Sequence, residues 1–136
     1  MKLLLTTFLF LSLLHARAQH PPGKDTAKEV TFTKVEIEAD YPGGERAWMQ
    51  YLNHNLHYPD DAISNEIKGK VIVQFVVDTN GVVSDIKAIS GPTRGGLREE
   101  AVRVIKASGN WIPATQNDVK VRSYKKIPIE FKLTVS

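Results

Sequence analysis

Residue types that bind metals gather at one place in this chain. His54 and His57 lie three positions apart, and Asp60 and Asp61 follow them. Imidazole nitrogens and carboxylate oxygens are zinc ligands, and a spacing of three places two side chains on one face of a helix. Pro59 stands between the two pairs and breaks the helical frame, because the residue before a proline is pushed out of the helical region. We therefore interpret these side chains as solvated polar groups near a helix end and predict no metal site.

Pairs of acidic residues are the second candidate for chemistry. Asp60-Asp61 and Glu99-Glu100 would suit acid–base catalysis if their carboxylates met across a cleft. Sequence neighbours on a helix point in different directions, so neither pair converges. Both pairs stand where a helix is expected to begin, and acidic groups there favour the helix dipole. We interpret them as helix-start residues.

The glycine-rich stretch at residues 91–96 resembles a phosphate-binding loop only in composition. The Lys-Ser/Thr pair that such a loop needs is absent, so we interpret the stretch as a connecting turn. The chain also lacks a G-x-S-x-G nucleophile motif and has no cysteine for thiol chemistry or disulfides. The sequence predicts a protein that is not an enzyme, with no cofactor and no small-molecule substrate.

The first 18 residues have the features of an exported protein's signal peptide. Lys2 is followed by an apolar run over residues 3–14, and Ala16 and Ala18 form the A-x-A pattern that precedes cleavage. Twelve helical residues reach about 18 Å, well short of the roughly 30 Å core of a bilayer. We expect cleavage after Ala18 and a periplasmic location. Attachment to the inner membrane is the alternative if the segment is retained.

The charge of the mature chain is nearly balanced. The full sequence has 18 basic and 15 acidic side chains, and loss of Lys2 and Arg17 would leave 16 and 15, a net charge of +1. The chain has no basic stripe with interleaved aromatic residues, so we predict no nucleic-acid partner. We expect residues 19–29 to form a flexible lead and residues 30–136 to form one domain.

Two helices are expected from apolar spacing. Trp48, Tyr51, Leu52 and Leu56 share one face of a helix that should begin at residue 44 or 45 and end before Pro59. Asp60 is expected to cap a short helix over residues 61–65. A further helix is expected over residues 97–108, with Gly109 as its C-terminal cap.

The strands are expected around a tight hairpin. Residues 70–77 are rich in β-branched side chains and apolar on both faces, which predicts a strand that is central in its sheet or covered on both sides. Asp78 and Gly81 suit a hairpin turn, and residues 82–90 should return as the partner strand. Residues 30–39 are expected to form a bulged strand or two short extended pieces.

The last extended segment, residues 119–135, contains Pro128. Because proline cannot donate to a strand ladder, we expect an edge strand, or a break near residues 127–128. The order of elements predicts an α+β domain of two layers, with the helices packed on one face of a small antiparallel sheet. Trp111 follows the last helix, and the sequence leaves open whether it closes the core or is an exposed aromatic.

The chain resembles the TonB C-terminal domain family, in the form found in Bacteroidetes-type bacteria. The matching motifs, in order, are Tyr41-Pro42-Gly43-Gly44, Tyr51-Leu52, Tyr58-Pro59, Gly69-Lys70-Val71, Val73-Gln74-Phe75-Val76-Val77-Asp78, Asn80-Gly81, Glu100-Ala101-Val102-Arg103-Val104-Ile105, Trp111-Ile112-Pro113 and Ile127-Pro128-Ile129-Glu130-Phe131. Their order and spacing carry the resemblance.

The resemblance implies a protein-binding module of the cell envelope. TonB C-terminal domains bind the TonB box, an extended peptide of outer-membrane transporters, which adds as a strand to an exposed sheet edge. We expect that edge here at Val119, Lys120, Val121, Arg122, Ser123, Tyr124, Lys125 and Lys126. Two alternatives stay open. One is a membrane-retained energy transducer that works with ExbB and ExbD. The other is an envelope-structural domain that associates with peptidoglycan or pairs with itself as a homodimer.

Overall fold

The computed structural model describes residues 29–134. The expected signal peptide and most of the expected flexible lead lie outside this range. The described residues form two longer helices, α1 (Gly44–Asn55) and α3 (Leu97–Lys106), and one short helix, α2 (Asp60–Ser64). The strands are β1 (Gly69–Val77), β2 (Val83–Ser90), β3 (Ala114–Gln116), β4 (Val119–Val121) and β5 (Ser123–Phe131). Among the described residues, no helix is long and apolar enough to cross a membrane.

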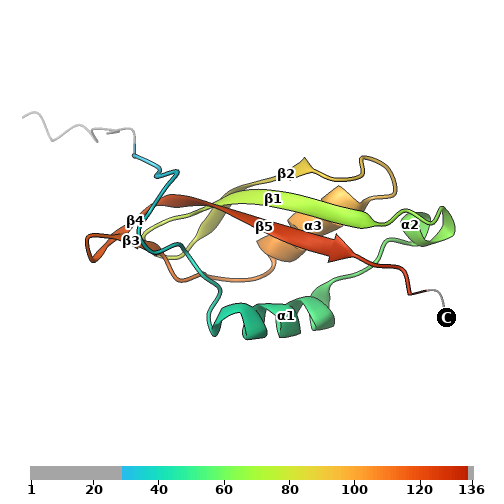
Figure 1. Ribbon diagram of the computed structural model, residues 1–136, viewed down its shortest axis with the longest axis horizontal. Coiled ribbons are helices and arrows are strands. Elements are labelled where there is room, and N and C mark those ends of the chain that lie inside the picture. Colours follow the sequence, from blue (N-terminus) through green and yellow to red (C-terminus); the bar gives the residue numbers. More distant parts are fainter. Residues whose placement is uncertain (1–28, 135–136) are drawn as a thin grey trace, which may run out of the picture.

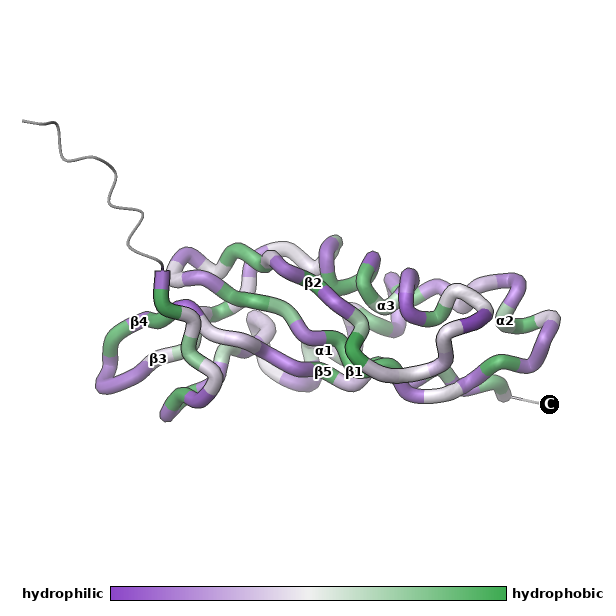
Figure 2. Tube along the Cα trace, turned by 90° about the horizontal axis from the view of Figure 1, so that it is seen from above, coloured by the Kyte–Doolittle hydropathy of each residue, from purple (hydrophilic) through white to green (hydrophobic). Residues whose placement is uncertain are grey.

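The main sheet has three antiparallel strands in the order β2-β1-β5 (Figure 1). The apolar run of β1 therefore lies at the centre of the sheet, which confirms the expectation from its two apolar faces. The molecule is elongated, with the β3–β4 hairpin at one end and α2 at the other (Figures 1 and 2). Buried and more exposed residues alternate along most of β5, as a strand with one covered face requires.

The helices and the covered face of the sheet form one hydrophobic core. Alternate side chains of β1 and β5 point into it, α3 packs behind β1 and β2, and α1 runs beside β5. The buried side chains at its centre are Trp48, Leu52, Val71, Val73, Phe75, Val77, Leu97, Ala101, Val104, Ile105, Ile127, Ile129 and Phe131. The structure is therefore the predicted α+β domain with its helices on one face of a small antiparallel sheet.

The turn between β1 and β2 forms as the sequence predicts. The Asp78 carboxylate accepts hydrogen bonds from the amides of Asn80 (2.8 Å) and Val82 (2.9 Å). Gly81 has φ 82°, and a Cβ at this position would overlap the carbonyl oxygen of Trp111. The turn thus requires glycine both for its backbone conformation and for its close approach to the residue-111 backbone.

Several element boundaries differ from the expected ones. Helix α1 ends at Asn55, four residues before Pro59, and its last backbone bond joins the Leu56 amide to the Leu52 carbonyl (2.8 Å). Asp60 is the first residue of α2 and makes no side-chain cap bond. Helix α3 ends at Lys106, with Ala107 in the cap position that we assigned to Gly109.

The long extended segment after residue 119 is divided into two strands. Residues Val119–Val121 turn back on β3, through positive φ values at Asn117 (50°) and Asp118 (62°), and only from Ser123 does the chain join β1. β5 continues through Pro128 without a break. Residues 30–39 are two extended pieces rather than a strand, with isolated bridges from Phe32 to Ser123 and from Ile37 to Thr115.

Candidate partner-binding edge

The backbone of β5 has one side that faces away from β1. The Tyr124 N–H donates to the Phe32 carbonyl (3.0 Å), on the side opposite β1. Strand backbone groups alternate in direction, so the amides and carbonyls of Lys126 and Glu130 and the carbonyl of Pro128 point the same way. Among residues 29–134, no strand pairs with them. We call the outward backbone groups of Lys126, Pro128 and Glu130 the free edge.

Pro128 fits this arrangement because the backbone groups of β5 point alternately toward β1 and toward the free edge, and those of Pro128 point toward the free edge. Pro128 lies opposite Ile72 of β1, but its backbone makes no hydrogen bond in the β1–β5 ladder. The N–H that proline lacks is therefore missing from the free edge and not from the ladder. The ladder keeps nine consecutive partners without a register shift. The free edge is consequently regular, with one donor missing at its centre.

A groove follows the free edge on the side of α1. One hollow of about 300 Å³ is lined by Trp48, Met49, Lys126 and Pro128, among others. A second hollow of about 300 Å³ continues along the edge to Glu130 and is also lined by Met49. Met49 is 49% exposed although it is a large apolar side chain. A strand added to the free edge would therefore place alternate side chains against α1.

The opposite edge of the sheet, on β2, is irregular. Its pairing with β1 shifts register twice, and Asp85 has a positive φ of 49°. Bulges and twisted backbone protect an edge strand against the addition of another strand. Of the two edges of the main sheet, β5 is the one that suits a partner.

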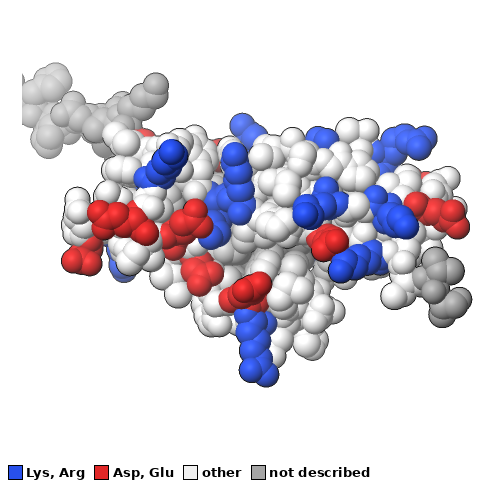
Figure 3. Space-filling view, in the orientation of Figure 1, with Lys and Arg blue, Asp and Glu red and all other residues white. Residues whose placement is uncertain are grey.

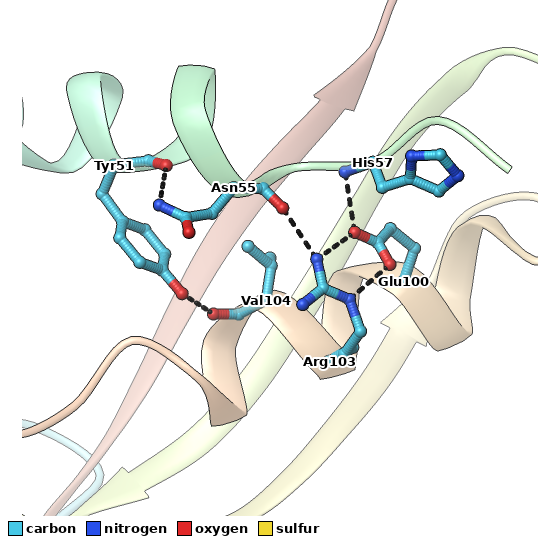
Figure 4. A network of polar contacts seen from close by, with 6 residues as sticks. All are labelled: Tyr51, Asn55, His57, Glu100, Arg103 and Val104. Carbon is cyan, nitrogen blue, oxygen red and sulfur yellow. Dashed lines mark hydrogen bonds and ion pairs between the residues drawn. The ribbon is translucent and has the colours of Figure 1, made fainter.

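Helix α1 is fixed beside the edge by a polar network that connects it to α3 (Figure 4). Arg103 donates to both carboxylate oxygens of Glu100 (2.6 and 2.7 Å) and to the Asn55 carbonyl at the end of α1 (2.7 Å). The Glu100 carboxylate also accepts the His57 amide hydrogen (2.8 Å). The Tyr51 hydroxyl donates to the Val104 carbonyl (2.7 Å). The network holds the C-terminal half of α1 at a set position relative to the sheet.

The ionisation of Glu100 follows from these contacts. Burial alone would raise the pKa of this carboxyl, but the hydrogen bonds from Arg103 and the His57 amide, together with the Arg103 charge, lower the pKa below its ordinary value. Burial raises the pKa of the Tyr51 hydroxyl, so that group stays protonated and acts as a donor. Glu100 is thus a charged tertiary contact. The interpretation of this residue as a helix-start side chain only was wrong, because its carboxylate turns toward residues 55–57.

The other candidates for chemistry have simple structural roles. The His54 ring nitrogen Nδ1 contacts the Gln50 carbonyl (2.7 Å), and within residues 29–134 no three side chains are grouped as metal ligands. The glycine-rich stretch connects β2 to α3. Basic and acidic side chains are interspersed on the sheet face shown in Figure 3.

Trp111 is a core residue. It is 3% exposed, its ring packs at 5.0 Å from Phe75, and its indole N–H donates to the Ser108 hydroxyl (2.9 Å). Tyr41 and Trp48 complete an aromatic cluster around it. The alternative of an exposed aromatic at residue 111 is wrong, because the ring is buried among these aromatic side chains.

The eight residues expected at the binding edge occupy different environments. Residues Val119–Val121 form β4 and pair with β3. Ser123 is buried, and the backbone of Tyr124 is engaged by Phe32, which leaves Lys126 as the one member of the set on the free edge. Sequence reasoning used Pro128 to predict an edge strand, and the strand order confirms it, but Pro128, Glu130 and Met49 were not placed in the binding set. Nothing in the sequence located α1 beside this edge.

The fold and this edge define a class of protein: a small α+β domain that presents one regular sheet edge next to a helix. The model of the family of Gram-negative bacterial TonB protein C-terminal domains matches residues 54–133, and the chain belongs to that family.

Relatives support the assignment. The TonB proteins of two Helicobacter pylori strains are each 33% identical to this chain over 102 residues, which is 72% of the chain and 34% and 35% of those proteins. The chain thus spans about a third of the length of these relatives. A solution structure of the H. pylori TonB C-terminal domain is 27% identical, with a TM-score of 0.51, and covers 65% of this chain and 78% of that one.

Proposed function

We propose that this protein is a periplasmic binding module whose β5 edge receives an extended peptide of an envelope protein. The partner that fits the family is a TonB-box-like segment of an outer-membrane transporter. The observation that supports the proposal is the free edge itself, a regular row of outward backbone groups beside a groove lined by α1. Backbone hydrogen bonds would supply affinity, and side chains in the groove would supply selectivity.

The free edge suggests five hydrogen bonds to an antiparallel partner. Lys126 and Glu130 each offer a donor and an acceptor, and Pro128 offers an acceptor alone. At about 1 kcal/mol net per bond, such a contact is weak by itself and depends on the groove for the remainder. The exposed Met49 and the half-buried Leu56 are the apolar groups there.

The test is a titration with synthetic TonB-box peptides from transporters of the same organism, followed by calorimetry and amide NMR shifts. We expect shifts at Lys126 and Glu130 and none at the β2 edge. Lys126→Pro removes an edge donor and should weaken binding by at least about fivefold, the value of one hydrogen bond of about 1 kcal/mol. Lys126→Ala changes the same side chain but keeps the N–H and should bind as the wild type does. A folded protein that binds none of the peptides contradicts the proposal.

A second copy of the chain is the other candidate partner for the same edge. Antiparallel pairing of two β5 strands about Pro128 would place Lys126 of one copy opposite Glu130 of the other, a favourable pair of charges. It would also leave the two Pro128 carbonyls facing each other without donors. Light scattering across a concentration series separates a homodimer from a monomer. A dimer whose Lys126 amide is protected would favour the self-pairing role.

A further inference from the structure

A short N-terminal segment, residues 29–34, lies on the same side of β5 as the free edge. The Phe32 amide donates to the Arg122 carbonyl (2.9 Å), and the Phe32 carbonyl accepts from the Tyr124 amide (3.0 Å). The bridge is parallel, so the segment occupies the place of an added strand at the beginning of β5. Figure 1 shows it in blue as it passes the start of β5 on the way to α1.

The side chain of Arg122 contacts this N-terminal segment. Arg122 donates to the Thr31 hydroxyl (2.9 Å) and lies 3.8 Å from the Glu29 carboxylate. The same guanidinium is 3.8 Å from Asp85 on β2. Arg122 therefore joins the segment to the sheet without burying it.

Residues 29–34 make few contacts with the rest of the domain. The bridge involves a single residue, and Val30 beside it is 70% exposed. Exposed ion pairs of this length contribute little, and segments with few buried contacts open at low free-energy cost. The covalent chain continues into residues 35–40, which pair with the backbone of β3 and Ile112 and remain in place when residues 29–34 detach.

We propose that residues 29–34 are an internal, displaceable strand that competes with the partner for the β5 edge. While it is bound, the edge ends at Tyr124 and accepts only a short peptide over Lys126–Glu130. When it detaches, the Arg122 carbonyl and the Tyr124 amide become available, and a longer extended partner gains two hydrogen bonds. The claim that detachment allows a longer partner to bind rests on the proposed function. The attachment and release of residues 29–34 do not depend on that function.

The first test follows the Tyr124 amide in the full exported chain by hydrogen exchange. Phe32→Pro removes the donor to Arg122 and should raise Tyr124 exchange at least tenfold. Phe32→Ala keeps both backbone bonds and should change it far less. The Ile129 amide, which by strand alternation faces β1, should exchange at the wild-type rate in both variants. Unchanged Tyr124 exchange in Phe32→Pro overturns the proposal.

The second test uses a locked variant and a defined peptide. Because the chain has no cysteine, Phe32→Cys with Ser123→Cys can form a single disulfide across the bridge. The probe is the hexapeptide of residues 29–34 (EVTFTK) with blocked ends. We expect the hexapeptide to bind Phe32→Pro and to shift its Tyr124 amide signal. The wild type should bind the hexapeptide at least tenfold more weakly. The oxidised locked variant should not bind it, and reduction of the disulfide should restore weak binding.

The two proposals fail in different ways. If the hexapeptide binds Phe32→Pro but no TonB-box peptide binds any variant, the internal strand stands and the proposed function falls. If TonB-box peptides bind equally to the oxidised lock and to Phe32→Pro, whatever their length, residues 29–34 do not compete and the internal-strand proposal is overturned.

Discussion

At the scale of single residues, Glu100 and Arg103 connect helix α3 to the chain that leaves α1. Glu100→Ala would leave the His57 amide without its acceptor and would free Arg103 from its carboxylate partner. Loss of a part-buried, charge-assisted contact of this kind costs about 1–3 kcal/mol. We expect the free energy of unfolding, measured in urea, to fall by that amount. The exposed neighbour Glu99 offers the control, since Glu99→Ala should change it by less than about 0.5 kcal/mol.

The same carboxylate predicts a pH dependence. The folded state lowers the pKa of Glu100. The stabilisation that the charged carboxylate gives to the folded state is therefore fully present above the pKa of the unfolded chain, 4.5, and is lost as the pH falls through the pKa of the folded state. The stability difference between the wild type and Glu100→Gln should therefore be constant near neutral pH and shrink below about pH 4.5. Urea unfolding from pH 7 to pH 3 measures it. A difference that grows on acidification would contradict the assigned charge.

Gly81 and Gly109 separate two effects of glycine at positive φ. Both have φ near 80°, at 82° and 79°, but a Cβ at residue 81 would overlap the Trp111 carbonyl, whereas a Cβ at residue 109 meets nothing within 4 Å. Gly109→Ala should cost about 1–2 kcal/mol from backbone strain alone. Gly81→Ala should cost at least about 2 kcal/mol more, because the Trp111 backbone must move. Thermal unfolding compares them, and equal losses would show that the contact is relieved without cost.

At the scale of elements, the free edge of β5 has one donor fewer than a regular strand. Pro128→Ala would restore an outward N–H without altering the bonds to β1. One added hydrogen bond of about 1 kcal/mol should raise peptide affinity about fivefold. Calorimetry with the peptide that binds the wild type measures the change, and light scattering shows whether self-association rises as well. An unchanged affinity would place the peptide away from residue 128.

The elements that the sequence predicts are those whose signal is local. The β1–β2 hairpin follows from alternating β-branched residues around Asp78 and Gly81, and α1 and α3 follow from apolar spacing. The β3–β4 hairpin does not, because Asn117 and Asp118 are non-glycine residues at positive φ and residues 119–131 carry one extended pattern throughout. The free edge required knowledge of strand order and of the position of α1, both set by packing between residues far apart in the sequence.

At the scale of the whole molecule, the two edges of the sheet differ in how open they are to an added strand. The β2 edge is bulged and carries Asp85 in a left-handed conformation, and the β5 edge is regular, with its beginning occupied by residues 29–34. Pro128 at the centre of the regular edge opposes pairing with a second copy, because two proline carbonyls would face each other without donors, while the edge remains open to a matched strand. Selective protection of this kind is expected of a module that binds extended chains in solution without aggregating.

The role of the domain also depends on what becomes of its first 18 residues. If the expected cleavage after Ala18 occurs, native protein recovered from cells will begin at Gln19 and will be found in the periplasmic fraction. The binding module then acts apart from the inner membrane. Intact-mass measurement of the native protein, with fractionation of the envelope, tests this expectation. Ala18→Leu removes the small residue that the peptidase requires and should leave the protein uncleaved and bound to membranes. A native chain that keeps residues 1–18 in the membrane fraction would instead favour the retained transducer, in which force applied at the N-terminus pulls directly on residues 29–34 at the β5 edge.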